Sequence, residues 1–128
     1  MATIELNQEN FESTLDDHNI VLVDFWAQWC GPCKMFGPTF EKVAEKHQDL
    51  AFAKVNNEEQ QDLAASFGIR SIPTLGVFKD KVLVFMQPGA LPETALETLV
   101  EKVKELDMNE VRKKLEEEAS TDQAAAVA

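Results

Sequence analysis

The sequence has 128 residues, the size of a single domain that can bury a hydrophobic core without disulfide staples. Apolar residues make up 45% and charged residues 27%, which excludes a fully disordered or collagen-like chain. Acidic residues outnumber basic residues by 23 to 12, and the net charge of -11 argues against binding to nucleic acid or to an anionic membrane surface.

No stretch of the sequence approaches 18 uninterrupted apolar residues, so we expect no membrane-spanning helix. The first ten residues contain acids where a signal peptide has bases and an apolar segment. We therefore expect a cytoplasmic protein, in a compartment where thiols are kept reduced. We also expect a monomer. The only two cysteines, Cys30 and Cys33, are too few for a disulfide framework, which directs attention to their chemistry.

The apolar residues alternate along the chain between strand-like and helix-like patterns. We expect strands at residues 3–6, 20–26, 51–55, 74–78 and 82–87. We expect helices at residues 8–16, 33–47, 58–67 and 92–106. The run IVLVDFW at 20–26 is typical of a central strand covered on both faces. This order predicts an α/β fold with helices on both faces of a central mixed five-stranded sheet. The residues assigned only to the core are Phe25, Phe52, Phe78, Phe85 and Met35.

Single residues mark where several of these elements begin, bend or end. Asn7 is a candidate cap for the start of the first helix, and Gly68 for the end of the third. Pro38 lies inside the second helical pattern and predicts a kink, because proline removes a backbone donor. Pro92 belongs to the first turn of the last helix. Residues 79–81, KDK, turn the chain into a hairpin.

A change in composition places a domain boundary after Leu106. Residues 107–128 form an acidic and Ala-rich extension with a net charge of -3. Asp107 and Glu110 have capping-box spacing, which predicts a short helix to about Ala119, with the rest frayed. Its weak apolar stripe would consist of Met108, Val111 and Leu115. The extension is either a solvated tail with no task or a contact site for a partner.

The most informative segment is WCGPCK at 29–34, where a central strand ends and a helix begins. Side chains three apart on a helix have β-carbons roughly 5 to 6 Å apart, and a disulfide needs about 3.5 to 4.5 Å. A small adjustment therefore opens or closes a bridge between Cys30 and Cys33. Helix N-terminal donors favour the Cys30 thiolate. Pro32 pre-sets the helix entry, and Gly31 leaves the approach to Cys30 open.

The positions of the two cysteines suggest a mechanism. Cys30, at the tip, attacks a target disulfide, and Cys33 then attacks the Cys30 sulfur and releases the reduced target. Asp24 is the candidate base for the second step, because a carboxylate inside an apolar strand is desolvated and its pKa rises. Lys54 interrupts another apolar strand and is a candidate counter-charge. The alternative for Asp24 is a purely structural ion pair.

A bare CxxC also occurs as half of a zinc site, which requires four ligands. The histidines His18 and His47 are the remaining candidates, and neither has a usable ligand spacing to the cysteines. We therefore expect no bound metal.

Two segments resemble the thioredoxin family. DFWAQWCGPCK at 24–34 resembles the family's active-site segment, and FGIRSIPTL at 67–75 resembles the segment around its cis-proline. The resemblance covers residues 3 to 106 and implies a thioredoxin fold followed by a short C-terminal helical extension. It implies that Cys30 is the nucleophile, Cys33 the resolving thiol, Asp24 the buried proton acceptor and Lys54 its modulator.

The resemblance also implies a surface that docks substrates beside the cysteines. That surface would comprise Trp29, Gly31, Pro32, Ile72, Pro73 and Gly89, with Trp26 and Pro38 as structural residues near the site. Ile72-Pro73 would be a cis peptide, although an ordinary trans turn is the alternative. Both tryptophans have a core alternative, and we expect Trp26 to be mostly packed and Trp29 mostly exposed. Gly89 would otherwise serve only a turn.

The resemblance implies a thiol-disulfide oxidoreductase that reduces protein disulfides and supports cell redox homeostasis. No cofactor would be bound, and electrons would come from NADPH through a flavoprotein thioredoxin reductase. The partners would be that reductase and disulfide-containing client proteins. The Gly-Pro dipeptide between the cysteines resembles the reducing members. One alternative is a thioredoxin-fold binding module or chaperone that uses the extension for a partner, and another is an exported thiol oxidant.

Three positions depart from the family pattern. The hairpin turn at 79–81 lacks the usual glycine, and aspartate tolerates a left-handed backbone less easily, so the turn is expected to shift. Gly76 stands in a strand that is normally bulky, which leaves room for close packing or weakens the strand. Pro88 precedes Gly89 and removes one backbone donor beside the substrate surface.

Overall fold

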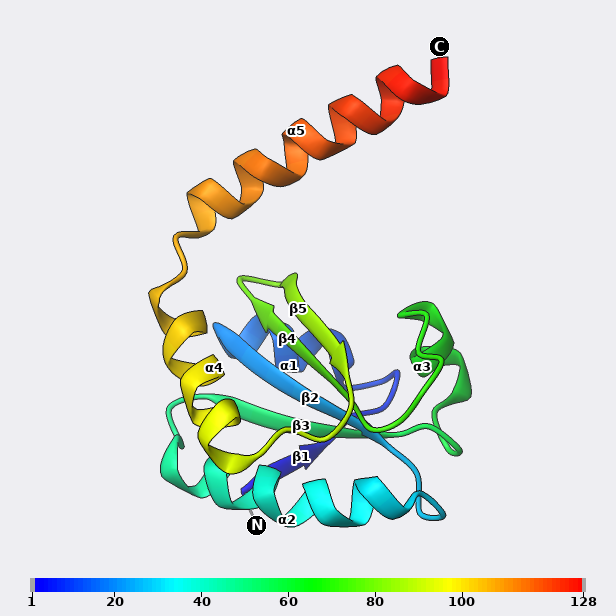
Figure 1. Ribbon diagram of the computed structural model, residues 1–128, viewed down its shortest axis with the longest axis vertical. Coiled ribbons are helices and arrows are strands. Elements are labelled where there is room, and N and C mark those ends of the chain that lie inside the picture. Colours follow the sequence, from blue (N-terminus) through cyan, green and yellow to red (C-terminus); the bar gives the residue numbers. More distant parts are fainter. Residues whose placement is uncertain (1, 128) are drawn as a thin grey trace.

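The computed structural model describes the backbone of residues 2–127 and the side chains of residues 2–119 (Figure 1). The strands are β1 (Thr3–Glu5), β2 (Ile20–Trp26), β3 (Ala51–Asn56), β4 (Thr74–Lys79) and β5 (Val82–Pro88). The helices are α1 (Phe11–Asp17), α2 (Gly31–Lys46), α3 (Gln61–Ser66), α4 (Glu93–Glu105) and α5 (Met108–Val127).

The five strands form one mixed sheet in the order β1-β3-β2-β4-β5. Strands β1 and β2 run parallel to β3, and β4 runs antiparallel to both β2 and β5. One buried cluster joins the sheet to α2 and α4, and a second joins its other face to α1 and α3. The predicted fold is confirmed, with helices on both faces of the sheet and a C-terminal helix.

The central strand β2 sends alternate side chains into the two clusters. Leu22 packs in the cluster under α2 and α4, whereas Val21 and Val23 pack in the cluster under α1 and α3. Asp24 has the parity of Leu22 and is 0% exposed. The alternation therefore places this carboxylate in the layer covered by α2, the helix that begins at the cysteines.

Two helices begin later than the sequence predicted, and both delays have the same cause. The side-chain oxygens of Asn7 and Asn56 each accept hydrogen bonds from the backbone N–H groups two and three residues further along. Each asparagine thus stabilises a turn that precedes the helix, instead of capping the helix itself. As a result, α1 begins at Phe11 and α3 at Gln61.

The hairpin turn between β4 and β5 is formed by Asp80 and Lys81, with φ of 52° and 67°. Positive φ is uncommon for such residues, and local bonds stabilise it here. The Asp80 N–H donates to the Asn19 carbonyl at 2.9 Å, and its carboxylate bonds the Asn19 amide and, at 3.1 Å, Arg112. The register of the β4–β5 pairing shifts between residues 77 and 78. The displacement of the turn from the family pattern stays a prediction. Gly68 ends α3 with a φ of 67°, as predicted.

The C-terminal helix is longer than predicted: α5 continues to Val127 instead of ending near Ala119.

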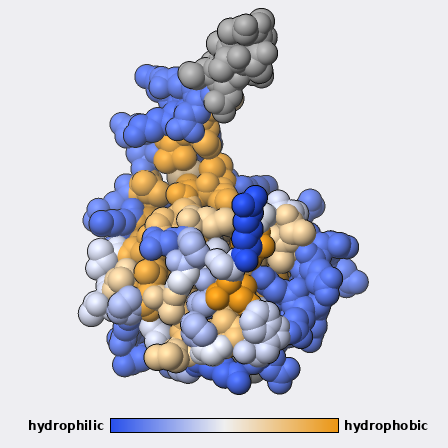
Figure 2. Space-filling view, turned by 45° about the vertical axis from the view of Figure 1, so that its right-hand side comes forward, coloured by the Kyte–Doolittle hydropathy of each residue, from blue (hydrophilic) through white to orange (hydrophobic). Residues whose placement is uncertain are grey.

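The end of α4 is capped by a buried lysine. The Lys79 ammonium donates to the carbonyls of Val103, Lys104 and Leu106 at 2.7, 3.0 and 2.9 Å. Met108 is buried, and beyond its first turns α5 projects away from the body (Figure 1). Figure 2 shows apolar surface of the body continuing onto the base of α5.

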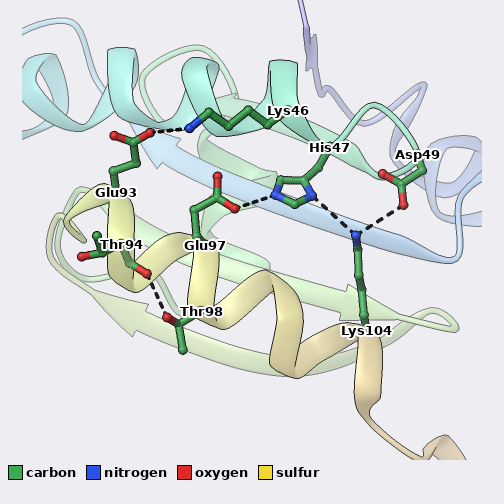
Figure 3. A network of polar contacts seen from close by, with 8 residues as sticks. All are labelled: Lys46, His47, Asp49, Glu93, Thr94, Glu97, Thr98 and Lys104. Atoms are coloured by element: carbon green, nitrogen blue, oxygen red, sulfur yellow. Dashed lines mark hydrogen bonds and ion pairs between the residues drawn. The ribbon is translucent and has the colours of Figure 1, made fainter.

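Polar contacts between α2 and α4 hold the C-terminal end of α2 (Figure 3). His47 Nε2 lies 2.6 Å from Glu97 Oε2, and Lys46 Nζ lies 3.0 Å from Glu93 Oε1. The Lys46–Glu93 pair is about half exposed and the His47–Glu97 pair is more buried, and both add to the apolar contacts beneath them. They link the C-terminal end of α2, opposite the cysteines, to α4.

Candidate redox site

The two cysteines lie where the sequence placed them, at the junction between β2 and α2. Cys30 is the N-cap residue of α2 and is joined by a disulfide to Cys33, with a Cα–Cα distance of 5.2 Å. The backbone N–H of Cys33 donates to Cys30 Sγ at 3.2 Å. Gly31 and Pro32 form the exposed first turn, and a Cβ added to Gly31 would meet no atom within 4 Å. The helix entrance thus directs a backbone donor at the first sulfur, and the space beside Gly31 is open.

In this oxidised state the two cysteines are equally buried, each 4% exposed, so exposure does not distinguish them. What separates them is their surroundings. Cys30 follows Trp29, which is 69% exposed, whereas Cys33 lines a depression together with Pro38 and Lys54. The kink predicted at Pro38 remains a prediction, although the residue lies inside α2.

A second segment meets the disulfide at the Ile72-Pro73 peptide, which is cis. The Ile72 carbonyl oxygen lies 3.7 Å from Cys30 Sγ. Gly89 contacts the same segment, because its N–H donates to the Pro73 carbonyl at 2.8 Å. Its φ of 99° is one that side chains rarely permit, so the backbone at this position requires glycine. The structure thus brings Cys30, Ile72, Pro73 and Gly89 together.

Asp24 is a fully buried carboxylate with no hydrogen-bond partner on either oxygen among the described residues. Burial raises the pKa of Asp24 from 3.8 to about 7, and the charge of Lys54 opposes part of that rise. Lys54 is its register neighbour on β3, yet no ion pair within 4.0 Å joins the two in the part of the chain described. A satisfied structural ion pair therefore does not account for Asp24.

The two tryptophans divide as the sequence predicted. Trp29 is exposed beside Cys30, whereas Trp26 is half-buried at the end of β2. The face of the Trp26 ring receives the Lys54 ammonium, 4.9 Å from its centroid. This cation–π contact was not predicted, because it depends on the register between two strands.

One assignment near the site is wrong. Met35 was assigned to the core, but it is 77% exposed. Cys33, Phe36 and Phe40 form the buried stripe of α2 at spacings of three and four, and Met35 lies outside that stripe. Helical periodicity read from Cys33 would have placed Met35 on the outer face, where it adds an apolar side chain near the disulfide.

Within the described residues, no group of three or more His, Cys, Asp or Glu side chains is placed to hold a metal ion. His18 contacts the Thr14 carbonyl, and His47 contacts Glu97. None of the helices in the described part of the chain has the length and apolar character required to span a bilayer.

A disulfide at a helix N-terminus, next to a cis-proline on this mixed sheet, defines a thiol-disulfide oxidoreductase. The thioredoxin family model matches residues 2–102. The curated protein "Putative thioredoxin 2" of Streptomyces coelicolor is 55% identical over 117 residues, which cover 91% of this chain and 87% of that protein. Thioredoxin 1 of Nostoc sp. is 41% identical over 103 residues, covering 79% and 96%.

The solved structures agree with this classification. A mutant thioredoxin from Halobacterium salinarum matches with a TM-score of 0.77 and 39% identity, covering 82% of this chain and 93% of that chain. A thioredoxin from Plasmodium falciparum matches with a TM-score of 0.72 and 34% identity, covering 78% and 98%. The chain therefore belongs to the thioredoxin family. It is a protein-disulfide reductase that works through the Cys30–Cys33 pair.

Proposed function

We propose that Cys30 is the nucleophile of this reductase and Cys33 the resolving thiol. The Cys30 thiolate attacks one sulfur of a client disulfide, forms a mixed disulfide, and expels the other client sulfur as a thiolate. Cys33 then attacks Cys30 Sγ, the mixed disulfide breaks, and the second client sulfur leaves. Two electrons and two protons thereby pass to the client, and the Cys30–Cys33 disulfide forms. The observation that carries this assignment is the Cys33 N–H donated to Cys30 Sγ at the helix N-terminus.

In this proposal Asp24 accepts the proton that Cys33 loses before it attacks. Its pKa of about 7 suits a group that must accept and release a proton near neutral pH. Lys54 modulates that pKa by favouring the charged carboxylate. The client is bound along Trp29, Gly31, Pro32, Ile72, Pro73 and Gly89. The Ile72 carbonyl beside Cys30 supports this placement, because an extended client segment can pair with a backbone edge there.

Alkylation of the reduced protein tests the assignment of the nucleophile. At pH 7 we expect iodoacetamide to modify Cys30 at least about tenfold faster than Cys33, because the helix N-terminus lowers the pKa of the first thiol. Mass spectrometry of peptides sampled over time gives both rates. The Cys33→Ser variant should keep the fast reaction, and the Cys30→Ser variant should show only the slow one. Equal rates for the two thiols would contradict the assignment.

For recycling, we propose that a flavoprotein thioredoxin reductase passes electrons from NADPH to the Cys30–Cys33 disulfide in the cytoplasm. Membership of the thioredoxin family supports this proposal. With purified reductase and insulin, we expect NADPH oxidation to depend on this protein and to stop with the Cys30→Ser variant. If dithiothreitol recycles the protein but the reductase does not, another electron donor serves it.

We also propose a domain boundary after Leu106, with residues 1–106 as the redox domain and residues 107–128 as an extension without a catalytic role. The family match ends at residue 102, and α4 ends at Glu105. The similarity to the Streptomyces relative spans 117 residues and so reaches into the extension.

A further inference from the structure

Lys54 lies between two carboxylates in a row that crosses three strands. In the register of β1, β3 and β2, Glu5 pairs with Lys54, and Lys54 pairs with Asp24. Neighbouring strands are about 4.8 Å apart, and register partners on parallel strands face the same side of the sheet. Glu5 is exposed and Asp24 is fully buried. The flexible Lys54 side chain can therefore extend toward the hydrated Glu5 carboxylate on β1 or toward the desolvated Asp24 carboxylate on β2.

The ammonium of Lys54 is held on the β2 side. Trp26 follows Asp24 by two residues on β2 and points to the same face of the sheet. The Lys54 Nζ lies 4.9 Å from the centroid of the Trp26 ring. On the other side α2 comes close at Gly37, where an added Cβ would lie 3.6 Å from Nζ. The Lys54 ammonium thus lies between the face of the Trp26 indole and the backbone of α2 at Gly37.

We propose that Trp26 is a positioning residue of the redox site, whose indole face holds the Lys54 ammonium beside Asp24 and away from Glu5. The effect on turnover rests on the role proposed above for Asp24 as proton acceptor. The position of the Lys54 ammonium does not depend on that role, because Trp26 contacts it in the protein without a client bound.

Several charged groups compete for Lys54 once the indole is removed. Glu41 on α2, which accepts a hydrogen bond from Thr3, lines one depression with Trp26, Lys54 and Lys34. Glu5 on β1 and Glu59 after β3 line a second depression that Trp26 and Lys54 also border. A lysine side chain is long, and its ammonium is strongly hydrated, so without an aromatic face it is drawn to water and to these carboxylates, of which Glu5 and Glu59 are exposed. Each of these alternatives moves positive charge away from Asp24.

Titration of Asp24 by NMR in the oxidised full-length protein tests the proposal. We expect Trp26→Leu to raise the pKa of Asp24 by about half a unit or more, because the carboxylate loses a nearby positive charge. Trp26→Phe keeps an aromatic face and should give a smaller rise. Trp29→Leu is the matched control, because Trp29 is exposed beside Cys30, and it should leave the pKa of Asp24 unchanged.

The Lys54→Met variant distinguishes positioning from a general loosening of the site. In that background the ammonium is absent, so we expect Trp26→Leu to cause no further rise in the pKa of Asp24. A rise of equal size with and without Lys54, or no rise in the native background, would overturn the proposal. The titration needs no turnover, so it still decides the role of Trp26 if Asp24 proves unnecessary for catalysis.

Discussion

We expect the Cys30→Ser variant to lose disulfide reduction completely, and the Cys33→Ser variant to stop after the first step with the client still attached. A serine hydroxyl is not ionised near neutral pH and cannot replace the thiolate that attacks the client. Cys33→Ser keeps the nucleophile and its helix N-terminus, but no second thiol is available to break the mixed disulfide. The two variants are therefore expected to fail at different steps.

Insulin reduction with dithiothreitol measures the first effect, since the separated chains precipitate. We expect the Cys30→Ser variant to give only the rate of dithiothreitol alone. Mass spectrometry without reductant measures the second effect, as a covalent adduct of the Cys33→Ser variant with a client that reductant releases. Met35→Leu is a suitable control, because Met35 is an exposed sulfur-containing neighbour with no assigned role. An adduct formed by Cys30→Ser but not by Cys33→Ser would reverse the two roles.

The parts of the site that were predictable from the sequence are local. The spacing of Cys30 and Cys33 and the break at Gly31-Pro32 determine a disulfide at a helix entrance without any distant contact. The burial of Asp24 follows from its place in an almost continuous apolar strand. Each of these conclusions needs only neighbours along the chain.

The parts that were missed depend on side chains that interact across elements or compete with helix formation. The Trp26–Lys54 contact joins residues that only the register of β2 and β3 brings together. The late start of α1 results from the side-chain bonds of Asn7, which favour a turn over a helix. The length of α5 was underestimated because its apolar stripe is weak, although its residues are good helix formers.

The Asp24→Asn variant is expected to be more stable than the native protein at pH 8 and slower in turnover. The pKa of Asp24 rises from 3.8 in water to about 7 in the folded protein. At a pH between these two values, the carboxyl group is protonated in the folded protein and ionised in the unfolded chain. The stability that this proton gives is fully present below the unfolded pKa and is lost as the pH rises through the folded pKa. The difference of about three pKa units corresponds to about 4 kcal/mol as an upper limit.

Asparagine carries no charge to desolvate, so the Asp24→Asn variant does not lose stability as the pH rises through the pKa of Asp24. We expect its advantage in unfolding free energy to be near zero at pH 4, to grow up to about pH 7, and to stay constant above that. Urea unfolding of the oxidised proteins across this range measures it. Asp62→Asn is the control, because Asp62 is exposed in the first turn of α3 and has no burial penalty to remove.

At pH 7 we expect the resolving step of the Asp24→Asn variant to slow by about tenfold or more, because Cys33 loses its proton acceptor. A variant less stable than the native protein at pH 8 would show that the Asp24 charge is satisfied in the fold, and the same result would remove the physical basis for its role as proton acceptor.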